Sequence, residues 1–140
     1  MDIAQASGFL NDHYQGVFIT LGGSGWPQAT NIVYAYADGV ARISVPSTTA
    51  KVRNLRRDDR ASLHVTTADF GWFVVAEGRA ELSAPSTEPG DQMGRALLDV
   101  YETIRKEPHP DHDEFFEVMA RDQRLVIRLH IERVYGRVPG

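Results

Sequence analysis

The sequence predicts one mixed domain that is mainly β (α+β), with six strands forming a small barrel and short helices at its periphery. Three observations predict this class. The chain has 140 residues, the length of a single domain, so residues 1–140 are taken as one unit. Turn signals at Gly22–Gly25 and Asp38–Gly39 separate short segments of strand character. Other apolar residues recur at three- and four-residue spacing, as in amphipathic helices.

Strand character is seen in six segments. In the first, Val17, Ile19 and Leu21 alternate with Phe18 and Thr20, which is the pattern of a half-buried strand. The last segment is an apolar run of β-branched character. The six predicted strands cover residues 17–21, about 28–37, 40–45, 61–66, 71–84 and 125–131.

Helical spacing is seen in four segments. Residues 3–13 predict a short amphipathic helix, and the hydroxyl residues Ser47–Thr49 predict the start of a second one that runs to about Arg57. Met93, Leu97 and Tyr101 lie on one face of a third helix that starts near Asp91. A fourth helix carries Phe115, Phe116 and Met119.

Composition excludes several classes of protein. The chain has 15 basic and 19 acidic residues, a net charge of −4, so we expect no general binding to nucleic acid or to a membrane surface. It has no cysteine, which excludes disulfides, thiolate nucleophiles and Cys-ligated zinc. It has no apolar run of membrane-spanning length, and its first residues lack the pattern of a signal peptide. We therefore expect a cytoplasmic protein.

The most informative segment is basic. Five of the 15 basic residues lie between Ser47 and Arg60. Hydroxyl residues at a helix start leave backbone N–H groups free for an anion, and Lys51 in the first turn can reach the same point. This predicts a phosphate site. The alternative is a solvated helix face balanced by Asp58 and Asp59.

Other motifs carry less information. Gly22–Gly25 lacks the residues of a Walker loop and fits a hairpin turn. The stretch His109–Asp113 contains metal-ligand types, but its aspartates are typical of a helix start, so we expect no metal site. His64 and His130 lie in strand patterns and are not predicted to be a catalytic pair. With no recognisable nucleophile motif, we predict no catalytic residue, and any reaction would depend on a cofactor.

Four segments, in the same order along the chain, carry a resemblance to a known family: residues 25–34, 50–62, 71–78 and 134–136. The chain resembles the split β-barrel flavin and deazaflavin oxidoreductases, the superfamily that contains pyridoxamine 5′-phosphate oxidase. Within it, the chain is most similar to the B group of actinobacterial proteins that use the deazaflavin coenzyme F420. The run from Lys51 to Asp58 is fairly specific to this group.

The resemblance implies a homodimer of six-stranded split barrels, with an FMN-type or deazaflavin cofactor in a groove at each end of the dimer interface. It implies a phosphate cradle made by Lys51 with Ser47, Thr49 and the Ala50 amide. Ser44, Gln28 and Asn31 resemble positions near the ring and ribityl chain, and Trp72 resembles the aromatic residue beside the site. From the residues alone, Trp72 could equally be ordinary core and Gln28 a surface amide.

Charge favours coenzyme F420 over FMN. FMN ends in one phosphate, whereas the deazaflavin coenzyme continues through a phosphodiester into lactate and several glutamates. If Lys51 serves the phosphate, the arginines at 53, 56, 57 and 60 are in excess, and on a helix they would share one face that could follow this tail. We therefore expect Arg56 and Arg57 to be cofactor-binding residues.

The resulting prediction is an F420-dependent oxidoreductase that transfers a hydride between the deazaflavin and a small conjugated acceptor. Two alternatives remain open at this point. One is an FMN-dependent enzyme with pyridoxamine 5′-phosphate oxidase-like chemistry. The other is a non-catalytic protein that binds F420 or a tetrapyrrole.

Overall fold

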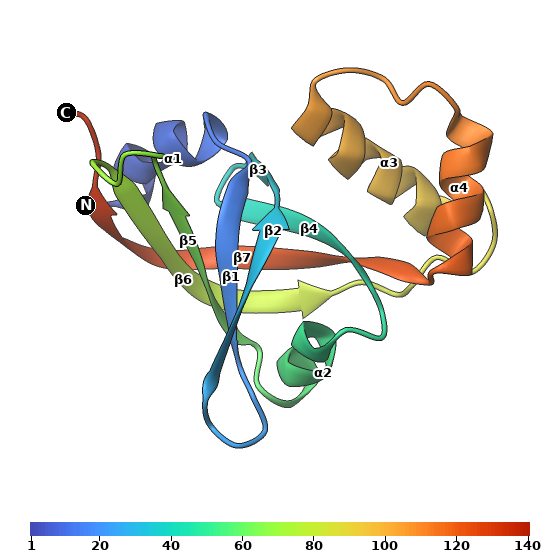
Figure 1. The fold of residues 1–140 in the computed structure, drawn as a ribbon, viewed down its shortest axis with the longest axis horizontal. Coiled ribbons are helices and arrows are strands. Elements are labelled where there is room, and N and C mark those ends of the chain that lie inside the picture. Colours follow the sequence, from blue (N-terminus) through green and yellow to red (C-terminus); the bar gives the residue numbers. More distant parts are fainter.

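The computed structural model describes all residues, 1–140, as a strongly curled antiparallel sheet with four helices around it (Figure 1). The strands are β1 (Gln15–Leu21), β2 (Pro27–Val33), β3 (Ala35–Ala37), β4 (Val40–Pro46), β5 (Arg60–Thr66), β6 (Phe73–Leu82) and β7 (Arg124–Arg137). The helices are α1 (Ile3–Asn11), α2 (Ala50–Arg57), α3 (Gln92–Arg105) and α4 (His112–Arg121). The mainly β class predicted from the sequence is confirmed.

The sheet has seven strands where the sequence predicted six. The difference arises at Tyr34, where the segment predicted as one strand over 28–37 is divided into β2 and β3. The Tyr34 side chain is fully buried, and its hydroxyl donates to the carbonyl of Leu10 at 2.8 Å. Its backbone N–H donates to the carbonyl of Tyr14, the residue before β1, and this is the last hydrogen bond between this segment and β1. Tyr34 therefore turns the chain out of one ladder and into another.

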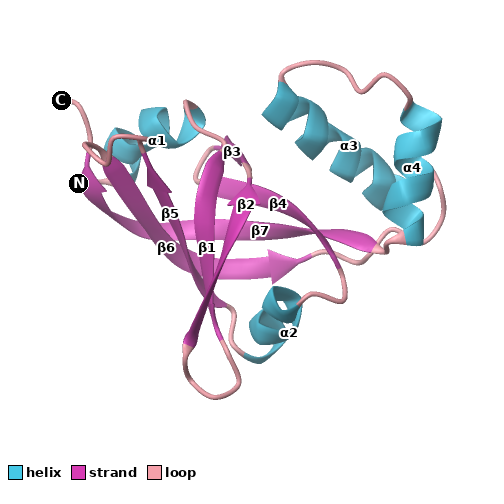
Figure 2. Ribbon diagram, in the orientation of Figure 1, coloured by secondary structure: helices cyan, strands magenta, loops and turns pink.

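The strand order explains why the barrel is open on one side. The strands lie in the order β2-β1-β5-β6-β7-β4-β3, so the two edge strands, β2 and β3, are consecutive in sequence. No hydrogen-bonded ladder joins these edges; they are connected only through the chain at Tyr34. The curled sheet with its helices outside is visible in Figure 2.

Turns and close approaches fix the register. Asp38 and Gly39 both have positive φ, 48° and 81°, as the predicted two-residue hairpin between β3 and β4 requires. The predicted turn at Gly22–Gly25 is present between β1 and β2. At the bulge between Glu77 and Gly78, a side chain at Gly78 would collide with the carbonyl of His130 on β7. These positions hold the curvature of the sheet.

Two apolar clusters lie on opposite faces of the sheet. A cluster of 19 buried residues fills the barrel and includes Val52 and Leu55 of α2. A second cluster of six lies outside the barrel, where Leu97 and Val100 of α3 meet Phe115 and Met119 of α4. In Figure 1, α3 and α4 lie together on one side of the sheet, and the two termini are close to each other at the end that carries α1. None of the four helices is both long and apolar enough to span a bilayer.

Candidate functional site

An open groove of about 690 Å³ lies outside the barrel, at the side where the sheet is split. We call it the polar groove, because polar side chains from five strands and from α2 line it. They are Gln15, Asn31, Ser44, Lys51, His64, Thr66 and Arg124. This set contains two permanent cations and no carboxylate, in a chain that is acidic overall. The groove is therefore suited to a ligand with negative charge.

Strand alternation decides which residues reach the groove. On β4, Ile43 and Val45 are buried in the barrel cluster, so Ser44 between them faces outward. On β2, Asn31 is exposed and lines the groove, while Gln28 is directed to the other face. Residues 28 and 31 are an odd number apart, so they cannot share a face of one strand. The structure thus brings Asn31 and Ser44 to the groove and separates Gln28 from them.

The start of α2 contributes an anion-binding geometry. Thr49 is the N-cap residue, with φ −72° and ψ 156°, but its side chain makes no capping hydrogen bond. The hydroxyl of Thr49 is buried and has no hydrogen-bond partner. The amides of Ala50 and Lys51 belong to the first turn, where a helix has no internal acceptors. Donors at the positive end of the helix dipole are therefore left for a ligand.

Lys51 and Arg124 give the groove its charge. Arg124 is the first residue of β7, and its guanidinium donates to the backbone carbonyl and the hydroxyl of Ser44, both at 3.2 Å. The Nε of Arg124 is buried without a partner. Burial, and next the nearby positive charge of Arg124, lower the pKa of Lys51 from its ordinary value of 10.5. Two cations without a counterion form a site that an anion would stabilise.

Two predicted site residues instead belong to a polar cluster on the inner side of α2, which we call the Asn54 network. Asn54 is only 7% exposed. Its Nδ2 donates to the Gln28 side chain at 2.8 Å and to the Thr20 hydroxyl at 3.1 Å, and its Oδ1 accepts from Arg57 at 2.8 Å. Asn54 thus connects α2 to Gln28 on the sheet, Arg57 supports Asn54 from within the helix, and neither Gln28 nor Arg57 lines the polar groove.

The expected stripe of four arginines is shorter than the sequence suggested. The helix ends at Arg57, so Arg60 lies on β5 and its guanidinium pairs with Asp58 at 2.7 Å. The prediction that residues 53, 56, 57 and 60 share one helix face is wrong, because the backbone is already extended at Asp58 and β5 begins at Arg60. Arg53 and Arg56 remain exposed on α2, and Arg56 makes no hydrogen bond or ion pair.

The last two predicted residues, Ser47 and Trp72, are not among those that line the polar groove. Ser47 lies two residues before the N-cap Thr49, and its N–H donates to the carbonyl of Gln123, which ties this turn to the start of β7. Trp72 lies just before β6, where the Arg137 guanidinium stacks over its ring at 5.1 Å. Trp72 does not line the polar groove of its own chain.

Arg124 was missed by the sequence reasoning. It stands outside the basic segment, and no motif surrounds it. It reaches the groove because β7 pairs with β4, which places Arg124 opposite Pro46, beside Ser44 and the start of α2. Only the register of two strands far apart in the sequence could have identified it.

Comparison with known proteins gives the family. Residues 3–137 match the family model described as pyridoxamine 5′-phosphate oxidase. The chain belongs to this family. The match spans nearly the whole chain, so the family is that of the full split barrel and confirms the resemblance seen in the sequence.

Solved structures agree with this membership. The conserved hypothetical protein Rv2991 from Mycobacterium tuberculosis is 26% identical, with a TM-score of 0.76 over 100% of this chain and 90% of that chain. An F420 reductase is 19% identical, with a TM-score of 0.67 over 91% of this chain and 94% of that chain. A FAD-binding protein from Mesorhizobium loti is 22% identical, with a TM-score of 0.67 over 98% and 93%. The fold is thus one that flavin- and deazaflavin-type proteins share.

Proposed function

We propose that the chain is a coenzyme F420-dependent oxidoreductase, which transfers a hydride between the deazaflavin and a small conjugated acceptor. One observation carries this proposal: at the start of α2, Lys51 and Arg124 face a groove without a carboxylate. Family membership supports a flavin-type cofactor. The choice among such cofactors rests on the charges around the groove.

The residues present fit a phosphate-bearing cofactor. The buried hydroxyl of Thr49 and the Nε of Arg124 lack partners, and an unpaired buried polar group costs about 1–3 kcal/mol. Phosphate oxygens are strong acceptors that would pair with such donors. We assign the phosphate to Lys51, Thr49 and the Ala50 amide, with Ser47 beside them.

The ring and the ribityl chain would lie along the rest of the groove. Asn31 and Ser44 are the polar side chains of β2 and β4 that face it. Because the barrel interior is filled by its own apolar cluster, a tricyclic ring would lie on this outer surface.

The exposed arginines favour the deazaflavin coenzyme over FMN. Arg53 and Arg56 lie on the solvent side of α2, close in sequence to Lys51 and without an acidic partner. An FMN phosphate would leave both unused. A chain of glutamates that continues beyond the phosphate would meet them, although screening by salt limits what such exposed contacts contribute.

The protein's part in catalysis would be binding and orientation. When bound, the deazaflavin ring supplies the two-electron chemistry. Ser44 is held in place by the Arg124 guanidinium, so the wall of the groove beside the ring is fixed before a ligand arrives. We assign no acid or base role to any side chain.

We also propose a homodimer. The polar groove is open on one side, and Val33 at its edge is 46% exposed. A second protein surface over the groove would cover this residue and the outer face of the ring. Sedimentation of the cofactor-bound protein tests this: we expect twice the monomer mass, and a monomer that binds cofactor tightly would contradict it.

Titration with each cofactor tests the function. We expect saturable binding of F420 at micromolar concentration and weaker binding of FMN, followed by absorbance because the two cofactors have different spectra. Micromolar binding of FMN without binding of F420 would reverse the assignment in favour of an FMN enzyme. Saturable F420 binding without oxidation of the reduced coenzyme by any quinone, enone or tetrapyrrole would identify a carrier instead.

A further inference from the structure

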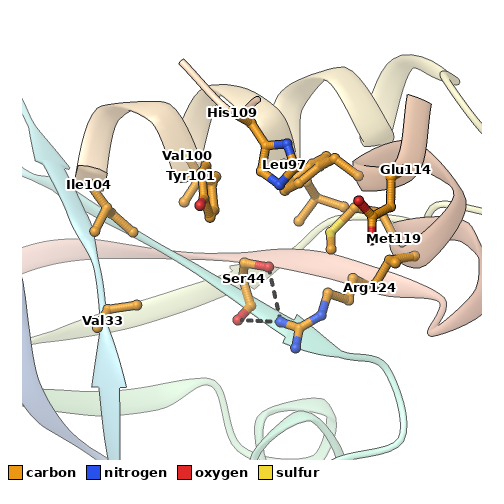
Figure 3. Close-up of a pocket in the computed structure, with 12 residues that line it drawn as sticks. Val33, Ser44, Leu97, Val100, Tyr101, Ile104, His109, Glu114, Met119 and Arg124 are labelled. Carbon is orange, nitrogen blue, oxygen red and sulfur yellow. Dashed lines mark hydrogen bonds between the residues drawn. The ribbon is translucent and has the colours of Figure 1, made fainter. Parts of the chain in front are cut away.

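A second cavity lies beside the polar groove and differs from it in chemistry. It measures about 350 Å³, and eight of its 12 lining residues are hydrophobic. We call it the apolar cavity; α3 and α4 form its roof and the outer face of the sheet forms its floor (Figure 3). Val33, Ser44 and Arg124 line both hollows, so the two meet along this shared wall.

His109 gives this cavity a directed hydrogen-bond donor. It lies in the connection between α3 and α4, with its ring against the rings of Tyr101 and Phe115 at 5.0 and 5.2 Å. The backbone N–H of Asp111 donates to Nδ1 of His109 at 3.0 Å. A nitrogen that accepts a hydrogen bond carries no proton, so the proton of the neutral ring lies on Nε2. No protein group accepts from Nε2.

The position of the ring directs this donor into the cavity. Figure 3 shows the His109 ring reaching into the cavity from the side opposite Ser44 and Arg124. The backbone N–H of His109 donates to the Glu102 carboxylate at 2.8 Å, which fixes the loop that carries the ring. A rigidly held donor over an apolar surface is the usual arrangement for orienting a small molecule.

Charge decides what kind of molecule fits. The cavity has one cation, Arg124, and one carboxylate, Glu114, so it has no net charge. The polar groove, by contrast, has two cations and no carboxylate. The apolar cavity therefore favours a neutral ligand, whereas the groove favours an anion.

We propose that the apolar cavity binds a neutral, planar, apolar compound that bears a carbonyl oxygen, and that Nε2–H of His109 donates to this oxygen. That this compound is the hydride acceptor rests on the proposed function, because the cavity opens onto the wall of the groove where the ring would lie. The binding itself does not depend on it.

A matched pair of probes tests the binding. 1-Indanone and indane have the same bicyclic skeleton, and only indanone has a carbonyl oxygen. The chain has three methionines, Met1, Met93 and Met119, and only Met119 lines the cavity. In the full chain labelled with methyl-¹³C methionine, we expect indanone to shift the Met119 methyl signal saturably and to leave Met1 and Met93 unchanged. Indane should bind roughly three- to tenfold more weakly, the usual effect of one hydrogen bond.

Three variants complete the test. His109→Phe keeps an aromatic ring and should reduce indanone binding to the level of indane. His130→Phe removes an exposed imidazole on β7 that does not line the cavity and should behave as wild type. Val118→Trp fills the cavity from the partly exposed face of α4 and should abolish the Met119 shift with both probes. Because Met93 packs against the same apolar cluster, an unchanged far-ultraviolet circular dichroism spectrum verifies that each variant is folded.

Several outcomes would overturn the proposal. Equal affinity for indanone and indane in the wild type would remove the role of His109. If neither probe shifts the Met119 signal, the cavity does not bind such a ligand. If the signal shifts only with protein concentration, a second copy of the chain covers the cavity. Because no coenzyme is present, each result can be separated from a failure of the F420 titration.

Discussion

Helix α2 contributes to two polar clusters. In one of them the buried polar side chain is hydrogen-bonded within the protein, and in the other buried polar atoms have no hydrogen-bond partner. In the Asn54 network, the Asn54 amide has a protein partner for both its nitrogen and its oxygen. At the polar groove, the Thr49 hydroxyl and Arg124 Nε have none, and the pKa of Lys51 is lowered. Satisfied buried groups stabilise a fold, while unsatisfied ones cost free energy that a ligand can recover. The first cluster is hydrogen-bonded within the protein, whereas the second keeps unpaired groups, which our proposal assigns to a ligand.

The largest expected effect is on stability, from Asn54→Ala. The change leaves the buried Thr20 hydroxyl and the Gln28 amide without their partner, so we expect the free energy of unfolding to fall by about 2–4 kcal/mol in urea titrations. The matched control is Asn31→Ala at the groove, which is exposed and should change stability by less than about 0.5 kcal/mol. Equal losses in the two variants would erase the distinction between the clusters.

The next effect is on affinity, from Lys51→Ala. The variant loses one charge-assisted contact of about 1.5–3 kcal/mol, so F420 should bind roughly ten- to hundredfold more weakly in absorbance titrations. Stability should hardly change, because Lys51 has no ion-pair partner in the protein. Arg95→Ala removes an exposed charge elsewhere and should leave affinity unaltered. Unchanged affinity with a lower melting temperature in Lys51→Ala would mean that the basic segment is only a structural helix face.

A smaller effect separates the two arginines of α2. Arg57 is engaged with Asn54, whereas Arg56 is unpaired. Arg56→Ala should lower the affinity for F420 by up to roughly fivefold at low salt, and this loss of affinity should vanish at high salt. It should not affect a coenzyme shortened to its phosphate. If Arg57→Ala lowers the affinity for the full-length coenzyme more than Arg56→Ala does, Arg57 must leave the Asn54 network to reach the glutamate tail.

The smallest expected effect is a change in the free energy of unfolding with pH. Folding lowers the pKa of Lys51 below its ordinary 10.5, so the unfolded chain holds this proton more tightly. The free energy of unfolding of the wild type should therefore rise relative to Lys51→Met as the pH climbs through the folded pKa toward about 10.5. Urea titrations of both chains at about pH 7.5 and pH 10 measure this difference. A slope of the opposite sign would mean that Lys51 has an anionic partner in the protein.

Most of the fold could be predicted because its signals are local. The alternation at Val17–Leu21, the turn at Asp38–Gly39 and the hydroxyls before α2 each determine structure within a few residues. The break at Tyr34 could not be predicted in this way, since it depends on hydrogen bonds from Tyr34 to the carbonyls of Leu10 and Tyr14, which lie about 20 residues earlier in the chain. The strand pattern of 28–37 continues across it without interruption.

The candidate site likewise contains residues that a local sequence signal identifies and residues that it does not. Lys51 and Thr49 were marked by a local motif and lie where the motif implied, at the start of a helix. Arg124 carries no local signal and reaches the groove only through the pairing of β4 with β7. Gln28 was grouped with Asn31 although their spacing in a strand puts them on opposite faces. That separation could have been read from the sequence once the strand was recognised.

The place of β7 in the sheet has a consequence for how the chain folds as it is synthesised. This last strand is central: it pairs with β6 on one side and with β4 on the other, joining Val40 to His130. Until residues 124–137 leave the ribosome, the hairpin of β3 and β4 has no partner in the sheet, and its edge is open to other chains. Such long-range pairing makes folding slow and leaves an intermediate prone to aggregation. Truncating β7 would divide the sheet into two separate pieces.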